Sequence, residues 1–226
     1  MKSFLDPSKK RTLIIGDVHG CFQELTHLLI SIKYQYKTDQ LIFVGDLINK
    51  GPASREVLEF VFNHKAQVVI GNHEMGLIRY IDQDIKDGHS LSTVKLSLGK
   101  DLHFWINWMR SLPSFIEYDD FTIVHAGKIP NKQFSEDDRT ILCTMRTCDK
   151  SSKDFQNPVN PPWYVLYHES KLIVYGHNAA LGLVERENSI GLDTGCVYGR
   201  QLSLLSLPDR KIYQIDAARQ YFPIDS

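Results

Sequence analysis

The sequence of 226 residues lacks a long apolar run, is poor in cysteine and carries no excess of either charge. No apolar stretch approaches the ~20 residues that a membrane span needs. Residues 1–11 are polar and contain lysines, a composition that argues against a secretory signal. The four cysteines form no CxxC pair, so we expect reduced thiols in a cytoplasmic protein and no disulfide framework.

The charges nearly balance, with 26 lysines and arginines against 27 aspartates and glutamates and no block of like charge. This balance indicates neither a general nucleic-acid surface nor an anionic-membrane surface. Attraction for an anionic substrate must therefore come from a local site. The apolar residues, 42% of the chain, suffice for a substantial core. We expect a single domain over residues 11–226 and a flexible lead-in over residues 1–10.

Apolar strand-like runs alternate with amphipathic helical patterns in the first third of the chain. The expected strands are 12–16, 41–45 and 67–70, and the expected helices are 21–33, 53–64 and one that begins at about 73. This βαβαβ order requires parallel strands joined by right-handed crossovers. The loops at the carboxyl ends of such strands are where α/β sheets gather ligands.

The remainder of the chain changes from helical to strand-like patterns. Residues 82–112 are expected to be helical, with aromatic side chains in the core, and residues 148–163 form a long irregular loop rich in proline and asparagine. Short strands are expected at 114–118, 121–125, 172–176, 189–193, 201–207 and 211–215. The predicted fold class is therefore α/β, a two-sheet mixed β-sandwich flanked by helices.

Three short motifs each follow an apolar, β-branched run and therefore lie where a buried strand ends. They are GDVHG at Gly16–Gly20, GDLINKG at Gly45–Gly51 and GNHE at Gly71–Glu74. They place two carboxylates, two imidazoles and an amide on three strand-end loops: Asp17, His19, Asp46, Asn72 and His73. Such a donor set forms a hard-to-borderline metal site. The motifs together indicate a two-metal phosphoesterase.

The spacing within these motifs supports a metal site. Asp17 and His19 lie two residues apart, so an extended strand end directs both side chains to the same side. Asp46 has two oxygens and can bridge two cations. His125 and His177 each follow an apolar strand and would complete the second ion. The other histidines lack this context and receive no role: His27, His64, His89, His103 and His168.

The combined motifs resemble the phosphoprotein-phosphatase branch of the calcineurin-like metallophosphoesterases over nearly the whole chain. The family pattern is GDxHG, GDxxDRG, GNHE, a strand-end histidine followed by two small residues, and a later strand-end Gly-His. The resemblance implies that one ion is held by Asp17, His19 and Asp46, and the other by Asp46, Asn72, His125 and His177. Two cations about 3.5–4 Å apart can bridge a hydroxide that attacks the phosphoryl group in line.

Three side chains are expected to act on the substrate. The resemblance implies that His73 protonates the leaving oxygen, while Lys50 lies on the same loop as Asp46 and would stabilise equatorial charge. Arg146 resembles the arginine that closes the phosphate clamp in these enzymes. The mixed oxygen and nitrogen ligands suit Mn²⁺, Fe or Zn²⁺, and we expect manganese to support activity in vitro.

The chain departs from the family pattern at Asn49-Lys50-Gly51, where phosphoprotein phosphatases have Asp-Arg-Gly. Asn49 cannot offer the charged partner that would raise the pKa of His73 and orient it, and Lys50 gives a point charge in place of a bidentate fork. This variant is similar to the diadenosine-tetraphosphate hydrolases and particularly to their shorter ApaH-like relatives. The segments 176–179 and 191–199 share that similarity, whereas Glu74 follows the phosphoprotein-phosphatase form.

Two enzymatic functions therefore stay open at this point. The first is a two-metal phosphohydrolase that acts on phosphoanhydrides, such as diadenosine tetraphosphate or related nucleotide and polyphosphate substrates. The alternative is a phosphoserine, phosphothreonine or phosphotyrosine protein phosphatase with the same site. Retention of all six expected ligands and of His73 argues against a non-catalytic binding module. The oligomeric state is left open.

Overall fold

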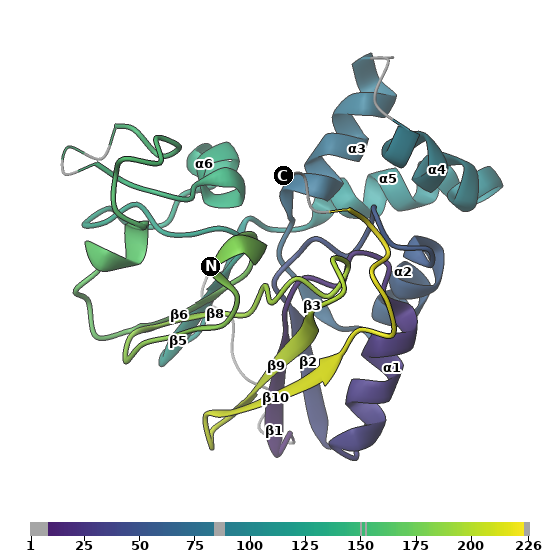
Figure 1. Ribbon diagram of the computed structural model, residues 1–226, viewed down its shortest axis with the longest axis horizontal. Helices are drawn as coiled ribbons and strands as arrows, with labels where there is room; N and C mark the ends of the chain where they lie inside the picture. The colour runs from purple at the N-terminus through teal and green to yellow at the C-terminus, as the bar shows by residue number, and fades with distance from the viewer. Residues whose placement is uncertain (1–8, 84–88, 150, 152, 224–226) are drawn as a thin grey trace.

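Two five-stranded mixed sheets form the centre of the computed structural model (Figure 1). The structure describes residues 9–83, 89–149, 151 and 153–223. The strand order is β10-β9-β1-β2-β3 in the first sheet and β4-β5-β6-β8-β7 in the second. Helices flank both sheets, which confirms the predicted fold class. That residues 11–226 form one domain stays a prediction, and most of the predicted lead-in, residues 1–8, lies outside the described residues.

The first sheet contains the predicted βαβαβ unit. Its elements are β1 (Arg11–Ile15), α1 (Phe22–Ser31), β2 (Asp39–Phe43), α2 (Ser54–Asn63), β3 (Gln67–Val68), β9 (Gln201–Leu207) and β10 (Lys211–Asp216). The strands β1, β2 and β3 pair in parallel, whereas β9 runs antiparallel to both β1 and β10. The carboxyl ends of the three parallel strands therefore meet at one edge, as the sequence predicts.

The alternation of side chains along β1 and β2 divides the core into two layers. Leu13 and Ile15 pack with the helical side chains of α1 and α2. Ile14, Ile42 and Val44 point to the opposite face, where they pack against apolar residues of the second sheet. Because every second residue faces each way, both faces of β1 and β2 are buried and the two sheets are held together.

The second sheet is built from short strands later in the chain. They are β4 (Phe115–Glu117), β5 (Phe121–Val124), β6 (Leu172–Tyr175), β7 (Val184–Glu185) and β8 (Ser189–Gly191). The strands β5, β6 and β8 pair in parallel, so their carboxyl ends also share one edge. The sequence predicts all of these strands except β7, which has only two residues and no periodic pattern.

The middle of the chain is helical, as predicted, with α3 (Asn72–Gln83), α4 (His89–Leu98) and α5 (Leu102–Ser111). Residues 84–88 of the predicted helical stretch lie outside the described residues. These helices gather on one side of the sheets (Figure 1). Trp105 is 4% exposed and belongs to the core, in agreement with the sequence interpretation. The short helix α6 (Arg139–Thr144) was not expected.

Short 3-10 turns and an irregular segment complete the chain. The turns are η1 (Gly99–Asp101), η2 (Glu136–Asp138), η3 (Trp163–Val165) and η4 (Ala179–Leu181). In the predicted irregular loop at 148–163, the carboxylate of Asp149 accepts hydrogen bonds from the backbone N–H groups of Ser151, Lys153 and Asp154. The loop is therefore ordered by side-chain acceptors and not by a regular ladder.

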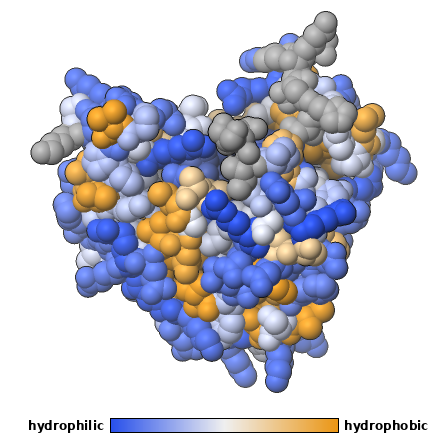
Figure 2. Space-filling view, in the orientation of Figure 1, coloured by the Kyte–Doolittle hydropathy of each residue, from blue (hydrophilic) through white to orange (hydrophobic). Residues whose placement is uncertain are grey.

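The surface has no single expanse of apolar residues on the face seen in Figure 2, where hydrophilic residues predominate between separate hydrophobic patches. The most exposed large hydrophobic side chains, Ile30, Leu96 and Val159, lie on different elements. Such isolated apolar side chains are ordinary for a folded surface. Among the helices of the described residues, none is long and apolar enough to span a membrane.

Candidate metal centre and substrate cavity

Asp46 lies at the centre of a cluster of imidazoles. Its Oδ2 atom is 3.5 Å from His19 Nε2, 3.4 Å from His125 Nε2 and 3.9 Å from His73 Nε2. Its Oδ1 atom accepts the backbone N–H of His73 at 2.9 Å. Asp46 participates in two groups of potential metal donors, one with His19 and His73 and the other with His125 and His177. A carboxylate shared by two donor groups is the arrangement that a bridging ligand requires.

Three histidines of this cluster are oriented by backbone carbonyl groups. The pairs are His19 Nδ1 with Ile48 O (3.0 Å), His125 Nδ1 with Val44 O (2.8 Å) and His177 Nε2 with Thr144 O (3.1 Å). A carbonyl oxygen can only accept, so each of these ring nitrogens carries the proton. In a neutral ring the opposite nitrogen then presents its lone pair to the cluster, as metal ligation requires.

Asn72 supplies the observation that tests whether this cluster fits a cation. Its Oδ1 atom lies 3.0 Å from His125 Nε2 and 2.8 Å from His177 Nδ1. His177 Nε2 donates to Thr144 O, so the Nδ1 atom of this neutral ring is an acceptor that faces another acceptor, Asn72 Oδ1. A cation between these two atoms would remove their repulsion. With Asp46 beside them, these residues fit a divalent ion.

Asp17 provides a second indication of a cation. Its side chain is buried, and Oδ2 accepts the backbone N–H of His177 at 3.0 Å. Its Oδ1 atom has no hydrogen-bond partner among the described residues. Burial, together with the charge of Asp193, raises the pKa of Asp17 well above its usual range. A buried carboxylate oxygen without a donor is unfavourable, and a bound cation would compensate for it.

His19, His177 and Asp46 have the protonation states that metal ligands require. Burial lowers the pKa of His19 well below its usual value and that of His177 to about 3, so both rings are neutral. Burial alone would raise the pKa of Asp46, but His125 and His73 outweigh it and hold this carboxyl ionised. Burial alone would lower the pKa of His125, but Asp46 outweighs it and raises the pKa to about 10. This ring would therefore release a proton when it binds an ion.

Three non-glycine residues of this site have backbone conformations in the left-handed region. His19, Asp46 and His177 have φ angles of 46°, 48° and 73°, which non-glycine residues adopt rarely. Such conformations cost on the order of 1–3 kcal/mol each and cluster at functional sites. Gly176, beside His177, is required for a different reason, because a Cβ atom there would lie 1.8 Å from Asp17 Oδ1.

Glu74 has a structural role that the sequence interpretation missed. Its fully buried carboxylate accepts the backbone N–H groups of Asp46 at 3.0 Å, Leu47 at 2.9 Å and Gly71 at 2.9 Å. Burial and the charge of Asp46 raise the pKa of Glu74 to about 7. Glu74 thus joins the Asp46 loop to the start of α3. Its position directly after the Asn-His pair was the only signal in the sequence.

His73 lies beside the cluster and is oriented by Asn49. The amide Nδ2 of Asn49 lies 2.9 Å from His73 Nδ1 and donates to it, which leaves the proton of the neutral ring on Nε2. The sequence interpretation held that Asn49 could not orient His73 because it lacks a charge. The structure corrects this point, since a neutral hydrogen bond fixes the ring.

One cavity of about 520 Å³ adjoins the cluster. Both cationic side chains named from the sequence, Lys50 and Arg146, line it, and so does Arg200. Lys50 Nζ donates to the hydroxyl of Tyr198 at 2.6 Å. The wall also contains Asp193 and Phe222. Sequence reasoning assigned no role to Asp193, Tyr198, Arg200 or Phe222, although the first two lie in the segment 191–199 that carried the family similarity.

Every site residue expected from the sequence lines the cavity except Asp17 and His125, which are buried. The structure brings all six expected ligands together. Their assignment as ligands, and the roles of His73, Lys50 and Arg146, stay predictions that this geometry supports.

The model of the calcineurin-like phosphoesterase family matches residues 10–180. The chain belongs to the calcineurin-like phosphoesterase family. It is therefore a hydrolase of a metal-dependent family, and its His and Asp groups could hold metal ions. The matched range includes all six expected ligands of this phosphoesterase, while the loop with Tyr198 and Arg200 lies beyond it.

Curated relatives of this phosphoesterase are tetraphosphatases. It is 29% identical to a symmetrical bis(5'-nucleosyl)-tetraphosphatase of Vibrio parahaemolyticus, over 91% of this chain and 98% of the relative. It is 30% identical to the asymmetrical bis(5'-nucleosyl)-tetraphosphatase PrpE of Oceanobacillus iheyensis, over 92% of this chain and 93% of the relative.

A solved structure supports the same relationship. A crystal structure provisionally described as a diadenosine tetraphosphatase superposes with a TM-score of 0.80 at 28% sequence identity, covering 95% of this chain and 96% of the other. The fold of this phosphoesterase is thus similar to that structure over nearly its whole length.

Proposed function

We propose that this phosphoesterase hydrolyses phosphoanhydride bonds of dinucleoside polyphosphates such as diadenosine tetraphosphate. The observation that carries the proposal is one cavity that adjoins the Asp46 cluster and is also lined by Lys50, Arg146 and Arg200. A polyphosphate spreads its negative charge over several phosphoryl groups. Three cationic side chains around one cavity suit such a chain of charges better than a single phosphate. The names of the relatives point to the same substrate class.

The cavity wall also offers aromatic surface for a nucleoside. Tyr198 and Phe222 both line it and are partly buried. Nucleobases stack on aromatic side chains irrespective of their hydrogen-bonding pattern. The combination of a cationic wall and aromatic surface therefore favours a nucleotide substrate over inorganic polyphosphate.

Metal ions are part of the proposal. Asp17, His19 and Asp46 would hold one ion, and Asp46, Asn72, His125 and His177 the other, with manganese the expected ion for activity in vitro. Bound divalent ions neutralise phosphoryl oxygens and lower the pKa of a water molecule. The chain's own groups do the rest. His73 holds a proton on Nε2 for the leaving oxygen, because Asn49 occupies Nδ1.

Lys50 and Arg146 would neutralise the charge that develops on the equatorial phosphoryl oxygens. The hydrogen bond from Lys50 to Tyr198 fixes the ammonium at the cavity wall before substrate binds. Such preorganised charge stabilises a transition state without reorganisation at the moment of reaction. We propose the cytoplasm as the place of action, where the four cysteines would stay reduced.

The experiment is a hydrolysis assay with diadenosine tetraphosphate. Purified protein is freed of metal with a chelator and then assayed with and without added Mn²⁺. We expect negligible hydrolysis without metal and recovery with Mn²⁺, and chromatography of the products assigns the bond that is cleaved. Two ADP molecules indicate symmetrical cleavage, whereas ATP and AMP indicate asymmetrical cleavage. Full activity in the metal-free protein contradicts the proposed metal centre, and no hydrolysis of diadenosine tetraphosphate with Mn²⁺ contradicts the proposed substrate.

A protein phosphatase with the same site is the second candidate, and Glu74 was the feature that favoured it. The carboxylate of Glu74 bonds to backbone N–H groups and is not among the residues that line the cavity. A glutamate at position 74 therefore stabilises the Asp46 loop and gives no information about the substrate. The protein-phosphatase function is accordingly the weaker of the two.

A further inference from the structure

A second cluster of potential metal donors lies apart from the Asp46 cluster. Cys21, Glu24 and Cys196 each offer one ligand atom, and these atoms all lie within 4.8 Å of one another. The three residues are 1%, 2% and 1% exposed, respectively. Cys21 precedes α1, Glu24 lies in its first turn, and Cys196 comes from the loop after β8. None of the three lines the substrate cavity.

Glu24 is only half satisfied by the protein. Its Oε1 atom accepts the backbone N–H of Ala218 at 3.0 Å and the hydroxyl of Tyr221 at 2.7 Å. Its Oε2 atom is buried and has no hydrogen-bond partner in the part of the chain that the structure describes. A buried carboxylate oxygen in this state calls for a bound cation or a buried water molecule.

The two thiols favour a cation over a water molecule at this position. Two sulfur atoms beside one carboxylate oxygen are poor hydrogen-bond donors and add little to the binding of a water molecule. The same three groups are ligands for a soft or borderline cation, since thiolates and carboxylates both coordinate Zn²⁺. We propose that Cys21, Glu24 and Cys196 bind a thiophilic divalent cation, with Zn²⁺ as the biological ion.

Binding at this site is coupled to the release of protons. Each thiol that becomes a ligand loses its proton to solvent, so up to two protons leave for each Zn²⁺ bound. No electron is transferred and no oxidant is needed.

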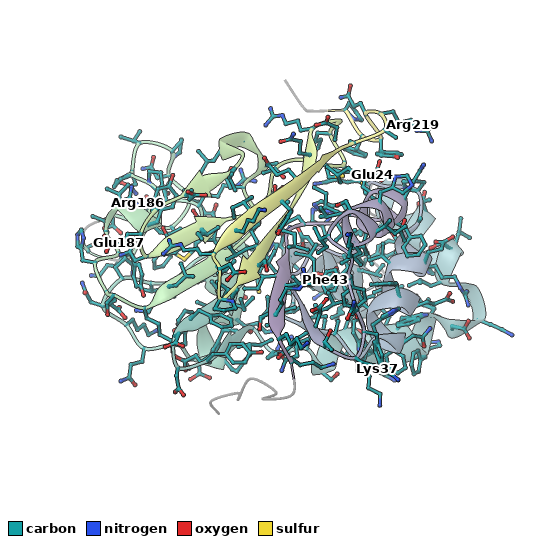
Figure 3. The ribbon with its side chains drawn as sticks, turned by 90° about the horizontal axis from the view of Figure 1, so that it is seen from below. Glu24, Lys37, Phe43, Arg186, Glu187 and Arg219 are labelled. Atoms are coloured by element: carbon teal, nitrogen blue, oxygen red, sulfur yellow. The ribbon has the colours of Figure 1, made fainter. Side chains whose placement is uncertain are left out.

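The cluster connects three parts of the chain that also contribute to the substrate cavity: the loop with His19, the loop with Tyr198 and the C-terminal segment. Cys21 follows His19, and Cys196 is on the loop that carries Tyr198 and Arg200 to the cavity wall. Figure 3 shows Glu24 on α1 near the C-terminal segment that carries Arg219. That segment is bonded to the same loop, because Val197 O accepts the backbone N–H groups of residues 221 and 222. The ion would therefore brace the substrate-binding wall.

The probe for this site is Cd²⁺, which has the ligand chemistry of Zn²⁺ and gives an ultraviolet charge-transfer band when thiolates bind it. The expected ligands of the catalytic centre are all oxygen and nitrogen, so they give no such band. Reduced full-length protein, its catalytic centre first loaded with Mn²⁺, is titrated with Cd²⁺. We expect the band to saturate at about one ion per chain, with proton release, and Zn²⁺ to remove it by competition.

Three variants test whether the charge-transfer band comes from the proposed ligands. Cys196→Ser should abolish it, and Glu24→Gln should keep it while weakening Cd²⁺ binding by about tenfold or more. Cys148→Ser is the matched control, since it removes a buried thiol from a different apolar cluster and should leave the band unchanged. If Cys196→Ser does not fold, the wild-type titration and Glu24→Gln decide.

Two results overturn the site. One is the absence of a charge-transfer band in the wild type at saturating Cd²⁺, which leaves only a buried water molecule beside Glu24. The other is a band that persists in Cys196→Ser or is lost in Cys148→Ser. Neither readout uses hydrolysis, so the outcome is independent of the proposed function.

Discussion

At the scale of single residues, the candidate centre depends on which nitrogen of each histidine carries the proton. His19 and His125 donate from Nδ1 and His177 from Nε2, in each case to a backbone carbonyl. The sequence predicts which residues gather at the centre, because each strand-end motif can be recognised from a short stretch of sequence. It cannot predict the tautomers or the role of Glu74, because both depend on contacts between distant loops that only the fold creates.

Asp46 is the residue whose loss should affect both ions. In Asp46→Asn the charge shared by the two donor groups disappears while the size of the side chain is kept. We expect kcat/KM for diadenosine tetraphosphate to fall at least about 10²-fold, together with bound Mn²⁺ measured by atomic emission. A variant that retains two ions per chain and near-normal activity would show that Asp46 does not bridge.

His73 should matter most where the leaving group is poor. General acid catalysis contributes roughly 10²–10⁴-fold, so His73→Asn should lose about that much on alkyl phosphates or anhydrides with basic leaving oxygens. Activated aryl phosphates need little protonation and should be affected far less. Asn49→Ala, which removes the bond to Nδ1, should give a smaller loss with the same dependence on the leaving group. Equal losses on both substrate types, at unchanged metal content, remove His73 from this role.

At the scale of secondary structure, the elements with a clear apolar pattern follow the sequence prediction, and the two that it missed, β7 and α6, are short. The parallel strands β1 and β2 and the helices α1 and α2 have clear apolar patterns. In contrast, β7 has two residues and α6 has six, too few for a hydrophobic period to emerge. Such elements form because their neighbours are already in place. Short segments thus depend on tertiary context.

Two glycines provide a matched test of how closely these elements approach. A Cβ atom at Gly176 would lie 1.8 Å from Asp17 Oδ1, whereas at Gly76, within α3, the nearest atom is 3.9 Å away. Gly176→Ala should therefore lower the free energy of unfolding by about 1–3 kcal/mol and displace Asp17. Gly76→Ala should raise it by about 0.5–1 kcal/mol. Denaturant unfolding measures both, and equal effects would contradict the packing described here.

At the scale of the whole molecule, the two sheets bring distant segments to one edge. Asp17 accepts from the backbone of His177, and Lys50 donates to Tyr198, contacts that span 160 and 148 residues of chain. The sequence predicts that each strand end carries a ligand. It does not predict which loop of the second half faces Lys50, because nothing in the local pattern encodes the packing of one sheet on the other.

Lys50 should influence the choice of substrate through this long-range contact. An ammonium is a point charge that requires no particular orientation of a phosphoryl group, whereas a guanidinium fixes one phosphoryl group by a bidentate contact. Lys50→Arg should shift the ratio of kcat/KM toward phosphomonoesters, and Lys50→Ala should slow both substrate classes. Tyr198→Phe keeps the ring and removes the bond to Lys50, so it should lower kcat on anhydrides with little effect on stability. An unchanged ratio in Lys50→Arg would exclude Lys50 as a specificity determinant.

The measurement that tests the account most directly is kcat/KM of the Mn²⁺-loaded wild type on diadenosine tetraphosphate and on a phosphoserine peptide, determined side by side. The cavity with three cationic side chains predicts a clear preference for diadenosine tetraphosphate. A phosphopeptide hydrolysed far faster than any nucleoside polyphosphate would contradict the anhydride function and favour the protein-phosphatase alternative.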